Sequence, residues 1–209
     1  MSKKATAQFW DTAHRYLGHQ LKVIRQVSSH TIDSYRDCLN SFIDYLERVE
    51  NISRKKISFH NFGKETIKRY QTWMITEQGL APKTCNLRLT AIRSFLEYAA
   101  QEYLWLMPVY TDACTGVKTP NHAIEYFEPD EMTALLAAPS GTSRTDRRNQ
   151  MMLIFLYDTA ARVAEARQVK VSDLHLDAGV PYVTLLGKGR KYRNIPLMEK
   201  TVLHLKRYL

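Results

Sequence analysis

The sequence predicts a mainly α-helical protein in two parts, a four-helix bundle followed by a smaller mixed α+β part with one β-hairpin. Apolar residues recur every three or four positions through residues 1–107, as in amphipathic helices. A stretch with three prolines and no helical period comes next. After it, two short β-type runs, PYVTLLG and RNIPL, flank a basic turn that contains two glycines.

Four helices with short connections are expected in the first part, which favours a small bundle. The first has an apolar face with Phe9, Tyr16, Leu17 and Leu21. The second starts after VSSH with Ser29 or Thr31 as its cap, and its apolar residues are Ile32, Tyr35, Leu39, Phe42, Ile43 and Leu46. A third helix ends at Gly79, and a fourth has Pro82 in its first turn, a position that proline favours.

A linker is predicted at Val109–Ala123, so the expected domains are residues 1–108 and 124–209. The second domain is expected to open with a helix in PDEMTALLAA, followed by a polar loop, GTSRTDRRN. MMLIFLYDTA is apolar all round and predicts a central buried helix. A short helix over Ala161–Val169, the hairpin and a final helix in MEKTVLHLKRYL complete the chain.

The net charge of +9 indicates a polyanionic partner, most simply nucleic acid, although a merely basic surface remains an alternative. The three cysteines form no CxxC pair, which favours reduced thiols in a cytoplasmic protein over a disulfide framework or a zinc site. The start has no secretory apolar region, and no apolar run reaches the ~18 residues of a membrane span.

Arg162 follows the apolar helix in DTAARVAEA and is expected in the first turn of a new helix. A guanidinium there could bind a phosphate through two hydrogen bonds, and Glu165 at i+3 could orient it. From these residues alone, an ordinary solvated Arg–Glu pair is the favoured interpretation.

Lys188 lies in the turn of the hairpin, where an ammonium could stabilise phosphate charge or donate a proton to a leaving oxygen. The alternative is a hairpin that contacts a nucleic-acid backbone only electrostatically. A phosphate-binding P-loop is excluded because GxxxxGK[ST] is absent.

Taken together, these motifs resemble those of the tyrosine recombinase (phage integrase) family, including its XerC/XerD-like members. DTAARVAEARQVKVSDLHLD resembles the family's first arginine box, and LLGKGRKYRNIPL its lysine hairpin. SSHTIDSYRDCLNSFIDYL and APKTCNLRLTAIRSFLEYAAQEYL are similar to paired helices of its N-terminal, SAM-like core-binding domain. The resemblance therefore covers nearly the whole chain and implies a core-binding domain followed by the first part of a catalytic domain.

The resemblance implies that Arg162 and Lys188 are catalytic and that Glu165 supports the arginine. In the implied reaction, which needs no metal or nucleotide cofactor, a tyrosine attacks a DNA phosphodiester and forms a 3′-phosphotyrosyl link. It also implies that the intact protein recombines or integrates DNA, in a mobile element, as a tetramer on double-stranded DNA. The 209-residue chain by itself is expected to be monomeric.

Further DNA contacts are predicted at two helix starts and in the hairpin, where polar side chains and free N–H groups suit phosphates. They are Ser28, Thr31, Lys83, Thr84, Asn86, Arg88, Arg93, Arg190, Lys191 and Arg193. Helix capping or plain solvation is the alternative for each, and we expect it to apply to about half of them.

The second His-x-x-Arg box and the tyrosine nucleophile of the family are not identified in these residues. His204-Leu205-Lys206-Arg207 fits the box but lies too close to the hairpin, and its helix is explained by packing. The usual Gly-Leu before the arginine is Ala160-Ala161, and Arg167 occupies a commonly apolar place, so both bear on the pose of Arg162.

The sequence therefore predicts a truncated recombinase that binds DNA without cleaving it. A non-catalytic regulator, or a dominant-negative occupant of recombination sites, is the alternative, and a general RNA-binding protein is a third option. The target DNA sequence does not follow from these residues.

Overall fold

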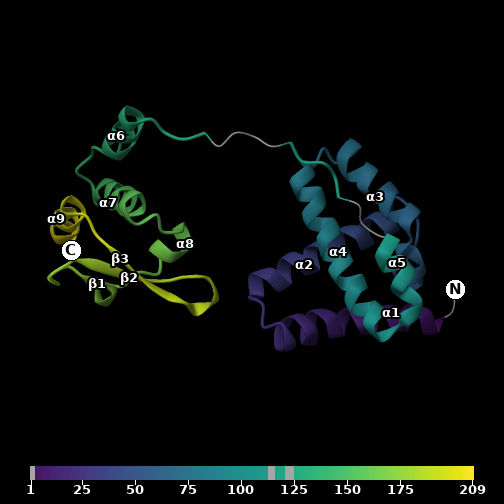
Figure 1. The fold of residues 1–209 in the computed structure, drawn as a ribbon. Coiled ribbons are helices and arrows are strands. Elements are labelled where there is room, and N and C mark those ends of the chain that lie inside the picture. The colour runs from purple at the N-terminus through teal and green to yellow at the C-terminus, as the bar shows by residue number, and fades with distance from the viewer. Residues whose placement is uncertain (1–2, 113–115, 121–124) are drawn as a thin grey trace. The chain divides into compact units, whose positions relative to one another are not determined.

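The computed structural model describes residues 3–112, 116–120 and 125–209 and divides into two compact units, Met1–His122 and Ala123–Leu209 (Figure 1). The predicted fold class is confirmed: the described chain is mostly helical, with one small antiparallel sheet. Each unit has a hydrophobic core of its own.

The four predicted helices of the first unit are present. They are α1 (Lys3–Arg15), α2 (Ser29–Arg48), α3 (Lys64–Thr76) and α4 (Pro82–Glu102). α1 continues as a π-helix, η1 (Tyr16–Ile24), and two 3₁₀ turns, η2 (Arg54–Lys56) and η3 (Phe59–Phe62), precede α3. The cap of α2 is Ser28, whose hydroxyl accepts from the backbone N–H of Thr31, and not Ser29 or Thr31 as predicted.

Aromatic side chains fill the core of the first unit. Eight aromatic residues of the described chain are at most 2% exposed: Phe9, Tyr16, Phe42, Tyr45, Phe59, Phe62, Tyr70 and Phe95. Several of their ring pairs pack edge-on, as between Phe9 and Phe95 and between Phe42 and Tyr70. Such geometry adds to the free energy of apolar burial. The aromatic residues of α2 and α4 therefore hold the bundle together, and the structure gives them no role as base-stacking surfaces.

The predicted linker is wrong in its first residues. After the 3₁₀ turn η4 (Leu104–Leu106), helix α5 (Met107–Asp112) contains Pro108 in its first turn, and Val109, Tyr110 and Val117 pack against the first core. Asn86 on α4 also holds Val117 by two backbone hydrogen bonds, of 2.8 and 2.7 Å. The described residues 107–112 and 116–117 therefore belong to the first unit.

The second unit opens with α6 (Pro129–Ala137) and α7 (Arg144–Thr159). The expected polar loop is shorter than predicted, because α7 starts at Arg144, where Ser143 caps it by accepting from the N–H of Asp146. α7 is not buried all round either. Met151, Phe155 and Thr159 form its buried face, whereas Tyr157 is 55% exposed.

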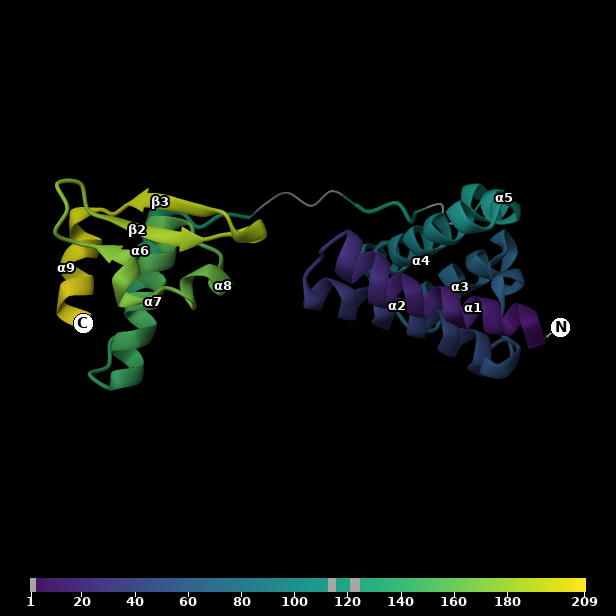
Figure 2. The same ribbon diagram turned by 90° about the horizontal axis from the view of Figure 1, so that it is seen from below.

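Three antiparallel strands form the sheet: β1 (Leu174–His175), β2 (Tyr182–Leu186) and β3 (Tyr192–Pro196), in the order β1-β2-β3. α8 (Val163–Ala166) and the 3₁₀ turn η5 (Val171–Asp173) precede the sheet, the turn η6 (Lys188–Arg190) joins β2 to β3, and α9 (Glu199–Tyr208) follows it. Helices α7 and α9 pack on the same side of the strands, against Val183 and Leu185 of β2 (Figure 2).

The register of the hairpin decides which side chains of β3 face this core. Val183 lies opposite Ile195, and Leu185 lies opposite Arg193. Since side chains alternate along a strand, Arg193 and Ile195 share the face on which Val183 and Leu185 are buried. Arg193 is therefore directed toward the inner side of the sheet, beside α8.

Candidate phosphate-binding site

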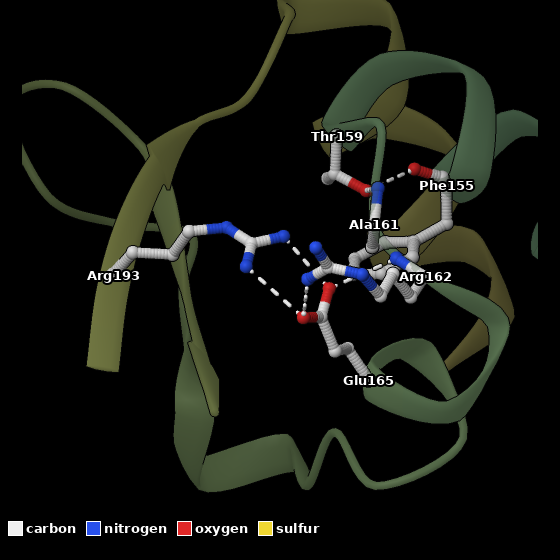
Figure 3. Close-up of polar contacts among 6 residues, drawn as sticks. All are labelled: Phe155, Thr159, Ala161, Arg162, Glu165 and Arg193. Carbon is white, nitrogen blue, oxygen red and sulfur yellow. Dashed lines mark hydrogen bonds and ion pairs between the residues drawn. The ribbon is translucent and has the colours of Figure 1, made fainter. Parts of the chain in front are cut away.

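The site begins at the break between α7 and α8, where the chain turns through a left-handed residue. Ala160 has φ 47° and ψ 31°, and its N–H donates to the carbonyl of Leu156, which ends α7. The hydroxyl of Thr159, itself buried, donates to the carbonyl of Phe155 and accepts from the N–H of Ala161 (Figure 3). These bonds fix the two residues that lead into Arg162.

Arg162 is the N-cap of α8 and keeps an extended backbone, with φ −66° and ψ 147°. Its side chain is 69% exposed. Only one nitrogen of the guanidinium has a partner among the described residues: Nη1 donates to Oε1 of Glu165 over 2.8 Å. Because arginine has five N–H donors, most of this guanidinium is free to bind a phosphate.

Glu165 lies one turn into α8 and is only 6% exposed. Oε1 accepts from Nη1 of Arg162 and, over 3.1 Å, from Nη1 of Arg193. Oε2 accepts from the backbone N–H of Arg162 over 2.9 Å and from Nη2 of Arg193 over 2.7 Å. These donors, Arg193 first, lower the pKa of Glu165 to about 2. These four hydrogen bonds fill the acceptor positions of the carboxylate. Glu165 is therefore suited to orient the two arginines and not to act as a proton acceptor.

Arg193 therefore has a different setting from the predicted one. It was predicted as a DNA contact, and in the structure its guanidinium forms a two-bond fork with Glu165 (Figure 3). Its side chain is 39% exposed. The contact joins residues 28 positions apart in the sequence, from β3 to α8.

The two glycines of the hairpin serve different purposes. Gly189 has φ 75°, a conformation that side chains disfavour, and nothing lies within 4 Å of where a Cβ would be. Gly187 has an ordinary backbone, but a Cβ there would lie 3.1 Å from Nη1 of Arg193 and 3.4 Å from Oε1 of Glu165. Gly187 therefore leaves room for the Arg193–Glu165 pair.

The remaining hairpin residues lie at the turn. Lys188 belongs to η6, and its side chain lies outside the described residues. Arg190 and Lys191 are exposed, and Arg190 has φ 58°, a strained value for a residue with a side chain. Arg167, which follows α8, is also exposed and has no ion-pair partner in the described part of the chain.

The predicted DNA contacts of the first unit have mixed settings. Lys83 is exposed and Thr84 half-buried at the start of α4, while Arg93 lies over the ring of Tyr110, 5.6 Å from its centre. Arg88 is half-buried and lines a polar groove with Asp37 and Asp44.

Ser28 and Thr31 bond to each other in the cap of α2, and the amide of Asn86 is occupied by Val117. Capping or anchoring therefore explains these three side chains without DNA.

Sequence reasoning missed Thr159 and the space left by Gly187, and it did not anticipate the contact of Arg193 with Glu165. For Arg193, a signal was present: Arg193, Ile195 and Leu197 alternate, as residues on one face of a strand do. The sequence does not show that Gly187 avoids a clash with neighbouring side chains whereas Gly189 adopts a positive φ. The role of Gly187 depends on the position of Glu165 in the folded unit.

No described group of three or more His, Cys, Asp or Glu side chains is placed to hold a metal ion. Within the described helices, none has the length and apolar character that crossing a membrane requires.

Comparison with known proteins gives two matches to family models. Residues 14–103 match the phage integrase N-terminal SAM-like domain, and residues 125–209 match the phage integrase family. The tyrosine recombinase XerD of Halalkalibacterium halodurans is 36% identical over 194 residues, which cover 91% of this chain and 61% of that protein. The XerD of Staphylococcus epidermidis is 30% identical over 192 residues, with 90% and 61% covered. The chain thus spans about three fifths of the length of these relatives.

Solved structures share the fold. The Tn1549 transposon integrase in complex with circular intermediate DNA aligns with a TM-score of 0.65 and 16% identity, covering 97% of this chain and 64% of that one. The XerH site-specific recombinase bound to difH substrate aligns with a TM-score of 0.63 and 19% identity, covering 88% and 52%.

Proposed function

Because this chain belongs to the phage integrase family of tyrosine recombinases, we propose that it provides the DNA-binding unit and the first arginine and lysine of a DNA strand-exchange site. The observation that carries the proposal is the setting of Arg162. A buried carboxylate holds its exposed guanidinium from one side, and the other N–H groups of the guanidinium have no partner in the described part of the chain. Such a group suits a phosphodiester, whose two non-bridging oxygens accept parallel hydrogen bonds.

In the proposed reaction, a deprotonated tyrosine oxygen forms a bond to the phosphorus of a DNA phosphodiester while the bond from phosphorus to the 5′ oxygen breaks. Arg162 stabilises the charge that develops on the non-bridging oxygens, because its donors are already oriented before the reaction. The leaving 5′ oxygen takes a proton from the ammonium of Lys188. Glu165 contributes by orientation alone, since its acceptor positions are filled.

DNA binding is proposed to rest on exposed cations of both units. Lys83 at the start of α4 and Arg190 and Lys191 in the hairpin have no competing partner in the described residues. Arg190 also keeps a strained backbone, as residues at functional sites often do. A non-catalytic regulator is less favoured than a recombinase, because the XerD relatives described above are named tyrosine recombinases.

The test is DNA affinity of the 209-residue chain across a salt series, beside Arg162→Ala and Lys188→Ala. Exposed Lys200 on α9 provides the control variant Lys200→Ala. The slope of log affinity against log salt is negative. Each lost phosphate contact should reduce its magnitude by about 0.9, and the control variant should leave it unchanged. Salt-independent binding, or equal effects of all three variants, would contradict the proposal.

A suicide DNA substrate separates binding from cleavage. Since no tyrosine nucleophile is assigned among these residues, we expect the 209-residue chain to bind this substrate without forming a covalent 3′ adduct. An adduct at Tyr208, detected by mass spectrometry, would show that the His-x-x-Arg motif at 204–207 has a catalytic role after all.

A further inference from the structure

The carboxylate of Glu165 is shared by two arginines that come from different elements. Arg162 contributes one side-chain bond from the start of α8, and Arg193 contributes two from β3. The fork of Arg193 is the stronger of these contacts because it is bidentate and charge-assisted. The orientation of Glu165, and through it that of Arg162, therefore depends on a residue of the hairpin.

The surroundings of Arg193 favour this contact. Its strand partner is Leu185, which is fully buried, so the side chain starts on the inner face of the sheet. Gly187, which directly follows β2, leaves the space that the guanidinium fills. Because the pair of Nη donors that forms this fork is bonded to Glu165, that pair is not available to form a fork with a DNA phosphate.

We propose that Arg193 is a positioning residue that fixes Glu165, and hence Arg162, to the hairpin whose turn contains Lys188, and that it does not itself bind DNA. This role is an alternative to the predicted DNA contact of Arg193. Its DNA readout rests on the proposed function, whereas the contact with Glu165 can be tested without DNA.

The first experiment follows the titration of the Glu165 carboxyl carbon by NMR in the wild type, Arg193→Gln, Arg193→Lys and Arg162→Gln. The wild-type pKa should be about 2. Arg193→Gln should raise it toward the ordinary value of about 4.3, and by more than Arg162→Gln does, because Arg162 retains its backbone N–H bond. An unchanged titration in Arg193→Gln, or a larger shift in Arg162→Gln, would overturn the proposal.

The second experiment is a double-mutant cycle on the affinity for a mixed-sequence duplex oligonucleotide, with wild type, Arg162→Ala, Arg193→Gln and the double variant. Arg193→Gln should weaken binding by about tenfold in the wild-type background and have no further effect beside Arg162→Ala. Arg193→Lys should behave like Arg193→Gln, because lysine retains the charge but cannot form the fork. Thermal unfolding of each variant verifies that it is folded.

The contrary outcomes are distinct. Additive losses, a salt slope lower by about 0.9 in Arg193→Gln and a near-normal Arg193→Lys would make Arg193 a direct phosphate contact. An altered titration with unchanged DNA affinity would make the fork purely structural, which also overturns the proposal. If the wild type binds no DNA, the proposed function fails, and the titration still decides whether Arg193 positions Glu165.

Discussion

Ala160, two residues before Arg162, has a strained backbone. Its left-handed conformation costs an L-residue roughly 1–2 kcal/mol, whereas glycine adopts it freely. Ala160→Gly should therefore raise the free energy of unfolding of the second unit by about 1 kcal/mol. Urea unfolding followed by the signal of this unit measures the change.

Ala138 is the matched control, because it is also an alanine C-cap in the same unit but has a right-handed backbone, with φ −56°. Because Ala138 has no left-handed strain, glycine there only adds backbone freedom to the unfolded chain. Ala138→Gly should therefore lower the free energy of unfolding by about 0.5–1 kcal/mol. Changes of the same sign in both variants would contradict the strain at Ala160.

The two hairpin glycines should respond to alanine in different ways. Gly187→Ala places a methyl group against Arg193 and Glu165, so we expect a loss of about 1–3 kcal/mol in stability and a higher pKa for Glu165. Gly189→Ala meets no atom but strains the backbone, which costs roughly 1–2 kcal/mol. NMR titration of Glu165 distinguishes them, since only Gly187→Ala should move its pKa.

At the scale of elements, helix α4 contains two predicted DNA contacts with different settings. The side chain of Asn86 is bonded to Val117, whereas that of Lys83 is exposed. Asn86→Ala should lower stability by about 1–3 kcal/mol, because it removes two hydrogen bonds to Val117, and should leave the salt slope of DNA binding unchanged. Lys83→Ala should do the reverse: it leaves stability unchanged but lowers the slope by about 0.9. Denaturant unfolding and a salt titration of both variants check this, and a lower slope in Asn86→Ala would restore it as a DNA contact.

The long helices and the hairpin could be predicted from sequence because their periodicity is strong and local. The apolar spacing of α2 and α4 extends over five turns or more, and the hairpin alternates around its glycines. Helix α5 was missed because Pro108 suggests an interruption, although proline is well tolerated in a first turn. β1 has only two residues, too few to show an alternation.

The candidate site was only partly predictable for a similar reason. Arg162 and Glu165 lie three positions apart, so their contact follows from helical geometry. The contact of Arg193 with Glu165 depends on how β3 is registered against β2 and where α8 lies beside the sheet. Both depend on tertiary structure, which the sequence of the hairpin does not show. Its basic composition suggested a DNA contact instead.

At the scale of the whole molecule, each unit has the means to fold separately. The core of the first unit consists entirely of residues between Phe9 and Leu106, with Val109, Tyr110 and Val117 packed on it, and the second core lies between Met151 and Leu205. Both units are basic, with 17 Lys and Arg against 11 Asp and Glu in residues 1–122, and 13 against 10 in residues 123–209. We therefore expect each unit to add phosphate contacts of its own.

The boundary of the first unit is testable with two fragments. Residues 1–122 include Val109, Tyr110 and Val117, whereas residues 1–108, the domain that the sequence alone predicts, lack them. Fragment 1–108 loses the partners of Asn86 and part of the apolar cover of α4, so it should be less stable than fragment 1–122 by about 2 kcal/mol or more. Denaturant unfolding by circular dichroism measures the difference.

DNA binding by the same fragments shows how the units combine. Fragment 1–122 should bind with a smaller salt slope than the full chain, because the cations of the second unit are missing. Adding residues 123–209 as a separate polypeptide should not restore the affinity, since tethering raises the effective concentration of the second unit near DNA. Full restoration in trans would show that the connection contributes nothing, and equal slopes would show that the second unit makes no phosphate contacts.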